Sequence, residues 1–391
     1  MGKIHGIEVS IAIADAAKLA RSDVIAAYPI TPQTHVVEHL SELVADGELD
    51  AEYIPVESEH SAMSACMGAA AAGARTFTAT ASQGLALMHE ILFIASGIRL
   101  PIVMVVANRS LSGPISIWND QSDAMSDRDC GWIQIFSENG QEAFDFTLIS
   151  FRVAEDRRIS LPAMMHFDGF ILSHVIEPID LPTQEEVDRF LPAFKPLRTL
   201  DVSKPISIGP VGVPDIYTEC HMAQEDALRR SYDVMLEAFE EFEKLFGRRY
   251  APVMTQDTED ADIVFVVAGA LTESIGTKVE ELRKKGEKVG VISLKLWRPF
   301  PGNDLVKAIG NAKVVAVVDR AISFGGPGGP IASEIKSFLY GQDKRPAVIE
   351  FICGLGGRDL PFTDIEDMYA KAKNVLKGSP MPPFEIVGLR E

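Results

Sequence analysis

The chain is long and strongly acidic. Its 391 residues exceed what a single hydrophobic core usually fills, so we expect two domains. Lys and Arg number 37 and Asp and Glu number 56, which gives a net charge of −19 and argues against a nucleic acid partner. The sequence shows no secretory leader and no apolar run long enough for a membrane span, so we expect a cytoplasmic protein.

The first half of the chain alternates strands with helices. After an amphipathic helix that begins near residue 11, short strands are predicted at 23–27, 53–56, 75–80, 101–107, 133–136 and 161–167. Helices are predicted between them at 58–72, 83–96 and 141–155. This strand-then-helix order predicts an α/β fold with a doubly wound parallel sheet.

The second half resumes the same alternation after a different connection. Prolines punctuate 178–214, which we interpret as a long crossing arm, and a predicted helix at 223–246 closes a first domain of residues 1–250. Strands are then predicted at 263–268, 289–295, 313–319 and 347–353. Helices are predicted at 274–285, 304–310 and 331–339. We therefore expect a second doubly wound parallel-sheet domain at 251–391.

Two features of the sequence bear on phosphate and metal binding. The stretch Gly325-Gly326-Pro327-Gly328-Gly329-Pro330 precedes a predicted helix, where it is either a phosphate cradle or, as we favour, a tight backbone turn. The cysteines are too far apart for an iron–sulfur or zinc motif: Cys66, Cys130, Cys220 and Cys353. We expect no metal site in this chain, so any electrons that it handles leave through another chain.

The first two strands end in segments rich in functional groups. The first is followed by Tyr28-Pro29-Ile30-Thr31-Pro32, and the second by Glu57-Ser58-Glu59-His60. The carboxyl ends of parallel strands are where open α/β sheets bind ligands. Glu59 falls in the first turn of a helix of small residues. Either it complements the helix dipole, or its carboxylate hydrogen-bonds a heteroaromatic nitrogen of a cofactor.

The next two strand ends carry a polar turn and an arginine. Ser82, Gln83 and Gly84 form a turn that either holds a polar ligand or simply caps a helix. Arg109 offers a planar fork suited to a carboxylate, with the Thr31 hydroxyl as a donor beside it. The polar stretch 118–123 that follows is either an active-site wall or an ordinary surface loop.

Several catalytic signatures are absent from the sequence. It has no HExxH, GxSxG, Walker A or Rossmann motif. It also lacks the Gly-Asp-Gly motif with a paired Asn that holds Mg²⁺ and diphosphate in thiamine diphosphate enzymes, because Phe167 rather than Gly precedes Asp168. If this chain binds thiamine diphosphate, another polypeptide must hold the diphosphate and its metal.

Taken together, the motifs resemble those of the alpha subunit of the pyruvate:ferredoxin oxidoreductase (pyruvate synthase) family. The matching segments are Tyr28-Pro29-Ile30-Thr31-Pro32, Glu57-Ser58-Glu59-His60, Thr80-Ala81-Ser82-Gln83-Gly84, Asn108-Arg109-Ser110-Leu111, Asp129-Cys130-Gly131-Trp132-Ile133-Gln134 and Gly354-Leu355-Gly356-Gly357-Arg358-Asp359. They occur in order along nearly the whole chain. The resemblance implies a pyrimidine-type thiamine diphosphate domain followed by a transketolase C-terminal-like domain.

The resemblance also implies roles for residues and partners. Glu59 would activate the aminopyrimidine ring as the catalytic carboxylate, while Thr31 and Arg109 would grip the carboxylate of a 2-oxo acid. Further cofactor contacts would come from Pro29, Ile30, Ser82 and Gln83. A beta subunit would supply Mg²⁺ and a 4Fe-4S cluster, with gamma and ferredoxin-like delta subunits completing the complex and ferredoxin or another acceptor taking the electrons.

The implied reaction is oxidative decarboxylation of a 2-oxo acid with coenzyme A, giving acyl-CoA and CO2. Because residue 31 is Thr rather than Arg, oxalate is not the expected substrate, and pyruvate is favoured. Aryl or branched-chain 2-oxo acids, and NAD as the final acceptor, stay open. Two other classes also stay open, namely a transketolase-like or 2-oxo acid dehydrogenase component and a non-catalytic scaffold subunit.

Overall fold

The computed structural model describes residues 3–380 and 382–390. Its larger sheet has seven strands in the order β12-β6-β7-β5-β4-β2-β3. They are β2 Val24–Ala27, β3 Glu52–Pro55, β4 Thr76–Thr80, β5 Ile102–Asn108, β6 Ile133–Phe136, β7 Ala163–Asp168 and β12 Leu296–Arg298. All neighbours in this sheet are parallel except β12, which runs antiparallel to β6. The predicted parallel α/β layer is confirmed.

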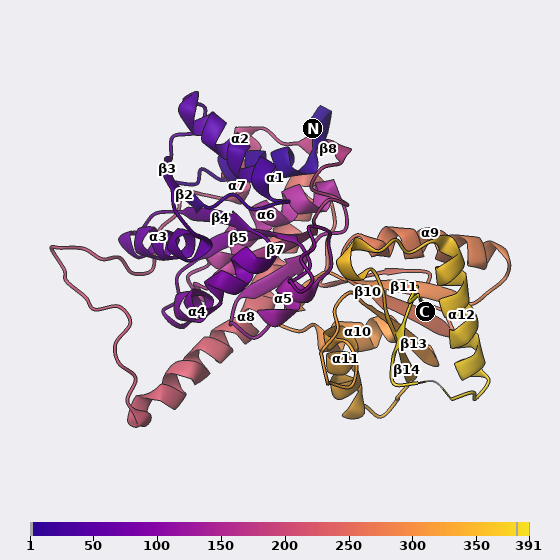
Figure 1. Ribbon diagram of the computed structural model, residues 1–391. Coiled ribbons are helices and arrows are strands. Elements are labelled where there is room, and N and C mark those ends of the chain that lie inside the picture. Colours follow the sequence, from indigo (N-terminus) through magenta and orange to yellow (C-terminus); the bar gives the residue numbers. More distant parts are fainter. Residues whose placement is uncertain (1–2, 381, 391) are drawn as a thin grey trace.

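Helices cover both faces of this sheet, as a doubly wound fold requires (Figure 1). Residues of α1 Val9–Leu19, α2 Thr34–Ala45 and α6 Gly140–Ala154 share one hydrophobic core with the sheet. Residues of α3 Glu59–Ala72 and α4 Ser82–Gly97 share a separate core with it. The central strands β4, β5 and β7 are buried along their whole length, and β5 is correspondingly apolar from Ile102 to Ala107.

The predicted crossing arm is partly regular structure. Strand β8 Ile176–Leu181 pairs antiparallel with β1 Lys3–Glu8, and helix α7 Gln184–Phe190 follows, started by a capping box between Thr183 and Glu186. Residues 192–213 contain no helix or longer strand, and in Figure 1 they extend away from the sheets before the chain returns. The return is α8 Pro214–Phe246, longer than predicted because Pro214 begins it at a position where helices accept proline.

The second sheet has six strands in the order β15-β14-β13-β10-β11-β9. They are β9 Val253–Gln256, β10 Ile263–Val267, β11 Val289–Leu294, β13 Val314–Asp319, β14 Ala347–Ile352 and β15 Glu385–Ile386. Its helices are α9 Leu271–Lys284, α10 Gly302–Ile309, α11 Pro330–Tyr340 and α12 Phe362–Leu376, with a short 3-10 turn, η1 Leu355–Gly357. Sequence analysis did not predict β9, β12, β15 or α12. The three strands are short edge strands, which carry too few residues for a clear alternation.

The two sheets are joined by more than the chain connection. Strand β12 follows β11 directly in sequence, yet it pairs with β6 of the larger sheet. Just before it, Lys295 is buried between Glu138 at 2.8 Å and Glu142 at 2.7 Å, and burial raises the pKa of Glu142 to about 7. The domain boundary at residue 250 stays a prediction, because a strand from the second half completes the first sheet.

Candidate active site

The direction of strand addition reverses between β2 and β4 in the larger sheet. From β2 the chain first adds β3 on one side, and then places β4 on the other side of β2. Such a reversal opens a crevice at the carboxyl ends of the strands, because the two connections diverge there. The segments that follow β2, β3, β4 and β5 contain Thr31, Glu59, Ser82 and Arg109 respectively. The fold therefore gathers the predicted residues at one edge.

Glu59 is the first residue of α3 and is only 7% exposed. Ser58 caps the helix by accepting a hydrogen bond from the Ser61 amide at 3.2 Å, which fixes where the helix begins. Among the described residues, no group hydrogen-bonds or pairs with the Glu59 carboxylate. A buried carboxylate without a partner is costly, so this one fits a donor from outside the chain.

The first turn of α4 lies directly against this carboxylate. A Cβ atom at Gly84 would be 2.7 Å from Oε1 of Glu59 and still closer to the Thr80 hydroxyl, so only glycine allows this approach. The hydroxyl oxygen of Thr80 is buried and has no hydrogen-bond partner within the described part of the chain. A narrow cradle thus surrounds two unsatisfied polar groups.

Ser82 and Gln83 stand beside this cradle. Ser82 has a left-handed backbone, with φ 46°, and its hydroxyl donates to the Ser110 carbonyl oxygen at 2.6 Å. The Ser82 hydroxyl also lies 2.7 Å from the Gln83 side-chain oxygen, and Gln83 is half-buried. The Ser82 side chain is thereby committed to the protein, while its backbone amide helps set the turn.

Arg109 and Thr31 are in contact, through the main chain of Thr31 rather than its hydroxyl. Nη1 of Arg109 donates to the Thr31 carbonyl oxygen at 2.9 Å, and Nε donates to the Ser116 carbonyl oxygen at 2.7 Å. Burial lowers the pKa of the Arg109 guanidinium below its ordinary value. The Thr31 hydroxyl and Nη2 of Arg109 have no partner among the described residues. Pro29 is exposed beside them, and Ile30 is half-buried against the first core.

Sequence analysis missed Asp123, which is fully buried in α5 Ser122–Ser126. Its Oδ2 accepts hydrogen bonds from the backbone amides of Ser82 and Arg109, both at 3.0 Å, and burial raises its pKa to about 7. The polar stretch 118–123 is not an ordinary surface loop, because Asn119, Asp120 and Gln121 are also buried. The available signal in the sequence was the run of amide and carboxylate side chains soon after the end of a strand.

The second sheet meets this edge at its own strand reversal, between β10 and β13. Arg320, just past β13, makes a buried ion pair with Asp168 at the end of β7. Asp168 also accepts from Asn119 at 2.9 Å and from the Ala270 amide at 2.7 Å. These contacts lock the two sheets together on the side where the polar stretch 118–123 lies.

The glycine-rich stretch 325–330 is a turn, as favoured from the sequence. The amides of Ile331 and Ala332, at the start of α11, both donate to the Asp319 carboxylate at 2.9 Å. The Gly329 amide donates to Glu350. A phosphate would need these same amides, and internal carboxylates already occupy them.

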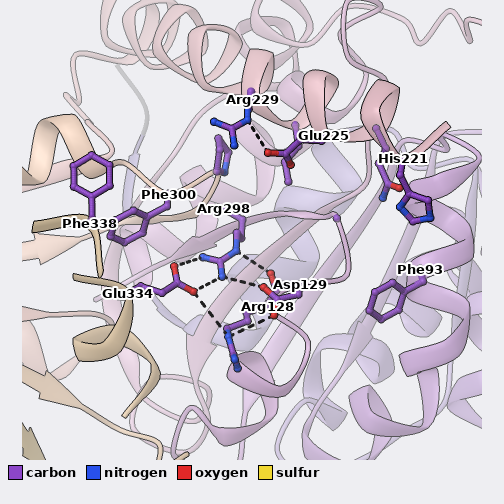
Figure 2. A pocket seen from close by; sticks show the side chains of 14 residues that line it. Phe93, Arg128, Asp129, His221, Glu225, Arg229, Arg298, Phe300, Glu334 and Phe338 are labelled. Atoms are coloured by element: carbon purple, nitrogen blue, oxygen red, sulfur yellow. Dashed lines mark hydrogen bonds and ion pairs between the residues drawn. The ribbon is translucent and has the colours of Figure 1, made fainter. Parts of the chain in front are cut away.

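A separate pocket lies between α4, α8 and α11, beside strand β12 (Figure 2). It encloses about 620 Å³. Its central side chain, Arg298, is held by Glu334 at 2.6 Å and by Asp129 at 3.3 Å. Arg229 at its rim pairs with Glu225 at 2.6 Å. None of the predicted site residues lines it, and these two arginines already have acidic partners.

The described residues offer neither a metal site nor a membrane-spanning helix. No group of three or more His, Cys, Asp or Glu side chains there is arranged to hold a metal ion. No helix in the same residues is long and apolar enough to cross a membrane. Cys66, Cys130 and Cys353 are buried, and Cys220 is exposed.

Comparison with known proteins identifies the class. The family model described as pyruvate flavodoxin/ferredoxin oxidoreductase, thiamine diP-bdg, matches residues 15–240. The model described as pyruvate:ferredoxin oxidoreductase core domain II matches residues 261–365. The chain is 49% identical to pyruvate synthase subunit PorA of Methanothermobacter thermautotrophicus, with 98% of each chain covered. It is 46% identical to ketoisovalerate oxidoreductase subunit VorA of Pyrococcus abyssi, over 92% of this chain and 90% of that one.

Solved structures agree on the fold. A 2-oxoglutarate:ferredoxin oxidoreductase from Magnetococcus marinus superposes with a TM-score of 0.71 at 19% identity, covering 95% of this chain and 65% of that one. A split-gene transketolase superposes with a TM-score of 0.54 at 13% identity, covering 95% and 99%. The chain is therefore a subunit of a thiamine diphosphate-dependent 2-oxoacid oxidoreductase of several subunits. It belongs to the pyruvate:ferredoxin oxidoreductase family, as the sequence motifs predicted.

Proposed function

We propose that this chain supplies the aminopyrimidine half of the thiamine diphosphate site in a pyruvate:ferredoxin oxidoreductase. The observation that carries the proposal is the Glu59 carboxylate, buried, without a partner among the described residues, and pressed against Gly84. Two PorA relatives at 49% identity, each covering at least 96% of both chains, support pyruvate as the substrate.

The residues present fit the aminopyrimidine ring. Glu59 would accept a hydrogen bond from a ring nitrogen, Gly84 lets the Glu59 carboxylate pack against the first turn of α4, and the Thr80 hydroxyl has no partner among the described residues. When bound, thiamine diphosphate supplies the carbanion chemistry that makes a 2-oxo acid lose CO2. Glu59 would hold the proton at the ring nitrogen and so set the tautomer of the ring.

The substrate carboxylate would lie between Arg109 and Thr31. Nη2 of Arg109 and the Thr31 hydroxyl are donors without partners among the described residues, and both flank the carboxyl edge of the sheet. A guanidinium with one free nitrogen and a neighbouring hydroxyl suits a small carboxylate. Pro29, Ile30 and Gln83 would form the wall around the cofactor, and the Ser82 amide would keep the turn in place.

Partner subunits would complete the enzyme. A beta subunit would hold the diphosphate, Mg²⁺ and a 4Fe-4S cluster, and gamma and ferredoxin-like delta subunits would carry electrons onward to ferredoxin. Coenzyme A would accept the acyl group. The support is the family membership, together with the lack of a Mg-diphosphate motif in the sequence.

Substitution of Glu59 tests the proposal in the assembled complex. Glu59→Gln keeps the size of the side chain but removes its basicity, so thiamine diphosphate should still bind while CO2 release falls by about a thousandfold or more. Glu57→Gln is the matched control, because Glu57 is an exposed acid in the same segment whose carboxylate accepts from the Ser61 hydroxyl at 2.7 Å. Full turnover by Glu59→Gln would overturn the role of Glu59.

A branched-chain 2-oxo acid is the second candidate substrate. The VorA relative, at 46% identity, is nearly as similar to this chain as the PorA relatives at 49%. Measuring kcat/KM with pyruvate, 2-oxoisovalerate and phenylglyoxylate on the purified complex separates the candidates. A higher kcat/KM for 2-oxoisovalerate than for pyruvate would make the branched-chain 2-oxo acid the substrate. The role proposed for Glu59 would stay the same.

A further inference from the structure

Asp123 collects hydrogen bonds from three separate segments of the chain. Oδ2 accepts from the backbone amides of Ser82 and Arg109, and Oδ1 accepts from the Asn108 side chain at 2.9 Å and the Ala124 amide at 2.8 Å. The side chain has 0% exposure. The same carboxylate therefore joins the start of α4, the end of β5 and its own helix, α5.

Only a carboxylate satisfies all these donors. Ionised, it offers two oxygens with about four acceptor positions, whereas an asparagine amide offers one oxygen and turns two donors toward the remaining N–H groups. A lone helix cap would need a single acceptor. Asp123 is fully buried and accepts more hydrogen bonds than the capping of α5 requires, because α5 spans only Ser122–Ser126.

The donors that Asp123 binds are those that set the candidate site. The Ser82 amide belongs to the turn that brings Gly84 against Glu59, and Ser82 adopts its left-handed φ there. The Arg109 amide fixes the residue whose guanidinium reaches Thr31. A shift of either amide would move the cofactor side and the substrate side of the site relative to each other.

A second layer keeps Asp123 itself in place. The Asn108 side-chain nitrogen lies 2.9 Å from Asp123 and 3.3 Å from Nδ1 of His166. Burial lowers the pKa of His166 to about 3, so the imidazole is neutral and Nδ1 accepts the second N–H of Asn108. With both N–H groups engaged, the Asn108 amide has one orientation, and it aims a donor at the carboxylate.

We propose that Asp123 is a positioning residue that fixes Arg109 and the first turn of α4 in one arrangement, so that the 2-oxo acid and the cofactor meet correctly. This inference rests on the proposed function. Asp123 touches neither substrate nor cofactor and acts through the two backbone amides that it binds. Its loss should therefore appear in substrate affinity and turnover together.

The test is Asp123→Asn in the assembled complex, with steady-state kinetics on the 2-oxo acid. KM should rise at least tenfold and kcat should fall, while thiamine diphosphate is retained. Asp127→Asn is the matched control, because Asp127 is another buried acid, at the C-terminal end of α5, whose carboxylate bonds His89 and Ser126 rather than Ser82 or Arg109. Its KM should stay within twofold of wild type. An Asp123→Asn enzyme with lower thermal stability but unchanged KM would reduce Asp123 to a structural role.

A double-mutant cycle separates positioning from general damage. If Asp123 acts through Arg109, the KM increase of Asp123→Asn should largely disappear in an Arg109→Ala background. Full additivity would overturn the inference. A different result would contradict the proposed function itself: an unchanged KM for Arg109→Ala alone. Should Asp123→Asn not assemble, Asn108→Ala removes one donor and keeps the carboxylate, and KM should then rise several-fold; an unchanged KM would again exclude positioning.

Discussion

Nη1 of Arg109 donates a hydrogen bond to the main-chain carbonyl oxygen of Thr31 over 2.9 Å. Arg109 follows β5 and Thr31 follows β2, and β4 lies between these strands in the sheet. The hydrogen bond therefore spans the end of β4, where the Ser82 turn begins. It leaves the Thr31 hydroxyl and Nη2 of Arg109 without partners among the described residues.

Removal of the Arg109 guanidinium should weaken substrate binding more than it slows any later step of the reaction. We expect Arg109→Ala to raise the KM for the 2-oxo acid by about a hundredfold, since loss of a buried charge partner costs roughly 2–5 kcal/mol. Arg109→Lys should recover little, because an ammonium cannot bond Thr31, Ser116 and a carboxylate together. Steady-state kinetics on the complex measure both.

The matched control for this prediction is Arg229→Ala. Arg229 is an exposed arginine whose partner is Glu225, at the rim of the cavity in Figure 2. Its removal should leave the KM for the 2-oxo acid within twofold of wild type. Equal KM values for Arg109→Ala and Arg229→Ala would exclude carboxylate binding at Arg109.

The close approach of Gly84 to the Glu59 carboxylate should be needed for cofactor binding. Gly84→Ala puts a methyl group 2.7 Å from Oε1 of Glu59, so either the carboxylate or the first turn of α4 must move. We expect the dissociation constant of thiamine diphosphate to rise at least tenfold, measured by titration of the cofactor-depleted complex.

Gly68→Ala is the control for this substitution. Gly68 lies in α3, and a Cβ atom there meets nothing within 4 Å. Because alanine favours helix over glycine by about 1 kcal/mol, Gly68→Ala should keep or raise stability and leave cofactor affinity unchanged. Similar cofactor affinities for the two variants would show that the Gly84 approach is not part of the site.

The buried pair of Arg320 and Asp168 should hold the two sheets together. Arg320→Met leaves the Asp168 carboxylate buried with neutral donors only, so we expect a loss of about 3–5 kcal/mol in the free energy of unfolding. The urea midpoint of the complex measures this loss. Lys313→Ala, which breaks an exposed pair with Asp262, should cost less than about 1 kcal/mol. Equal costs would contradict the interface role.

Asp319 should make stability depend on pH in a defined direction. Burial raises its pKa from 3.8 to about 7 although the amides of α11 bond it. A raised folded-state pKa means that this contribution is full at low pH and is lost as pH rises toward 7. The stability advantage of wild type over Asp319→Asn should thus shrink by about 1.4 kcal/mol per pH unit between pH 5 and 6, and more slowly as the pH approaches 7. A stability advantage of wild type that grows over this pH interval would contradict the prediction.

Local patterns in the sequence were sufficient for most of the fold. Apolar runs such as Ile102–Asn108 are buried strands, and their alternation with helices defines a doubly wound layer with little freedom in topology. These patterns did not predict the elements that form only through tertiary contacts. Strand β12 exists because β6 offers it an edge, and residues 178–190 are ordered by pairing with β1 and by a capping box.

The sequence by itself determined which residues lie together at the candidate site, because Thr31, Glu59, Ser82 and Arg109 all follow strands whose ends must meet at one edge. Only the tertiary structure decided how they are used. Hydrogen bonds between distant segments have no local signal, so the sequence did not show that the Thr31 carbonyl accepts from Arg109, or that Asp123 accepts from the amides of both Ser82 and Arg109. Burial likewise depends on packing between separate segments, and packing against the first turn of α4 leaves Glu59 buried without a partner among the described residues.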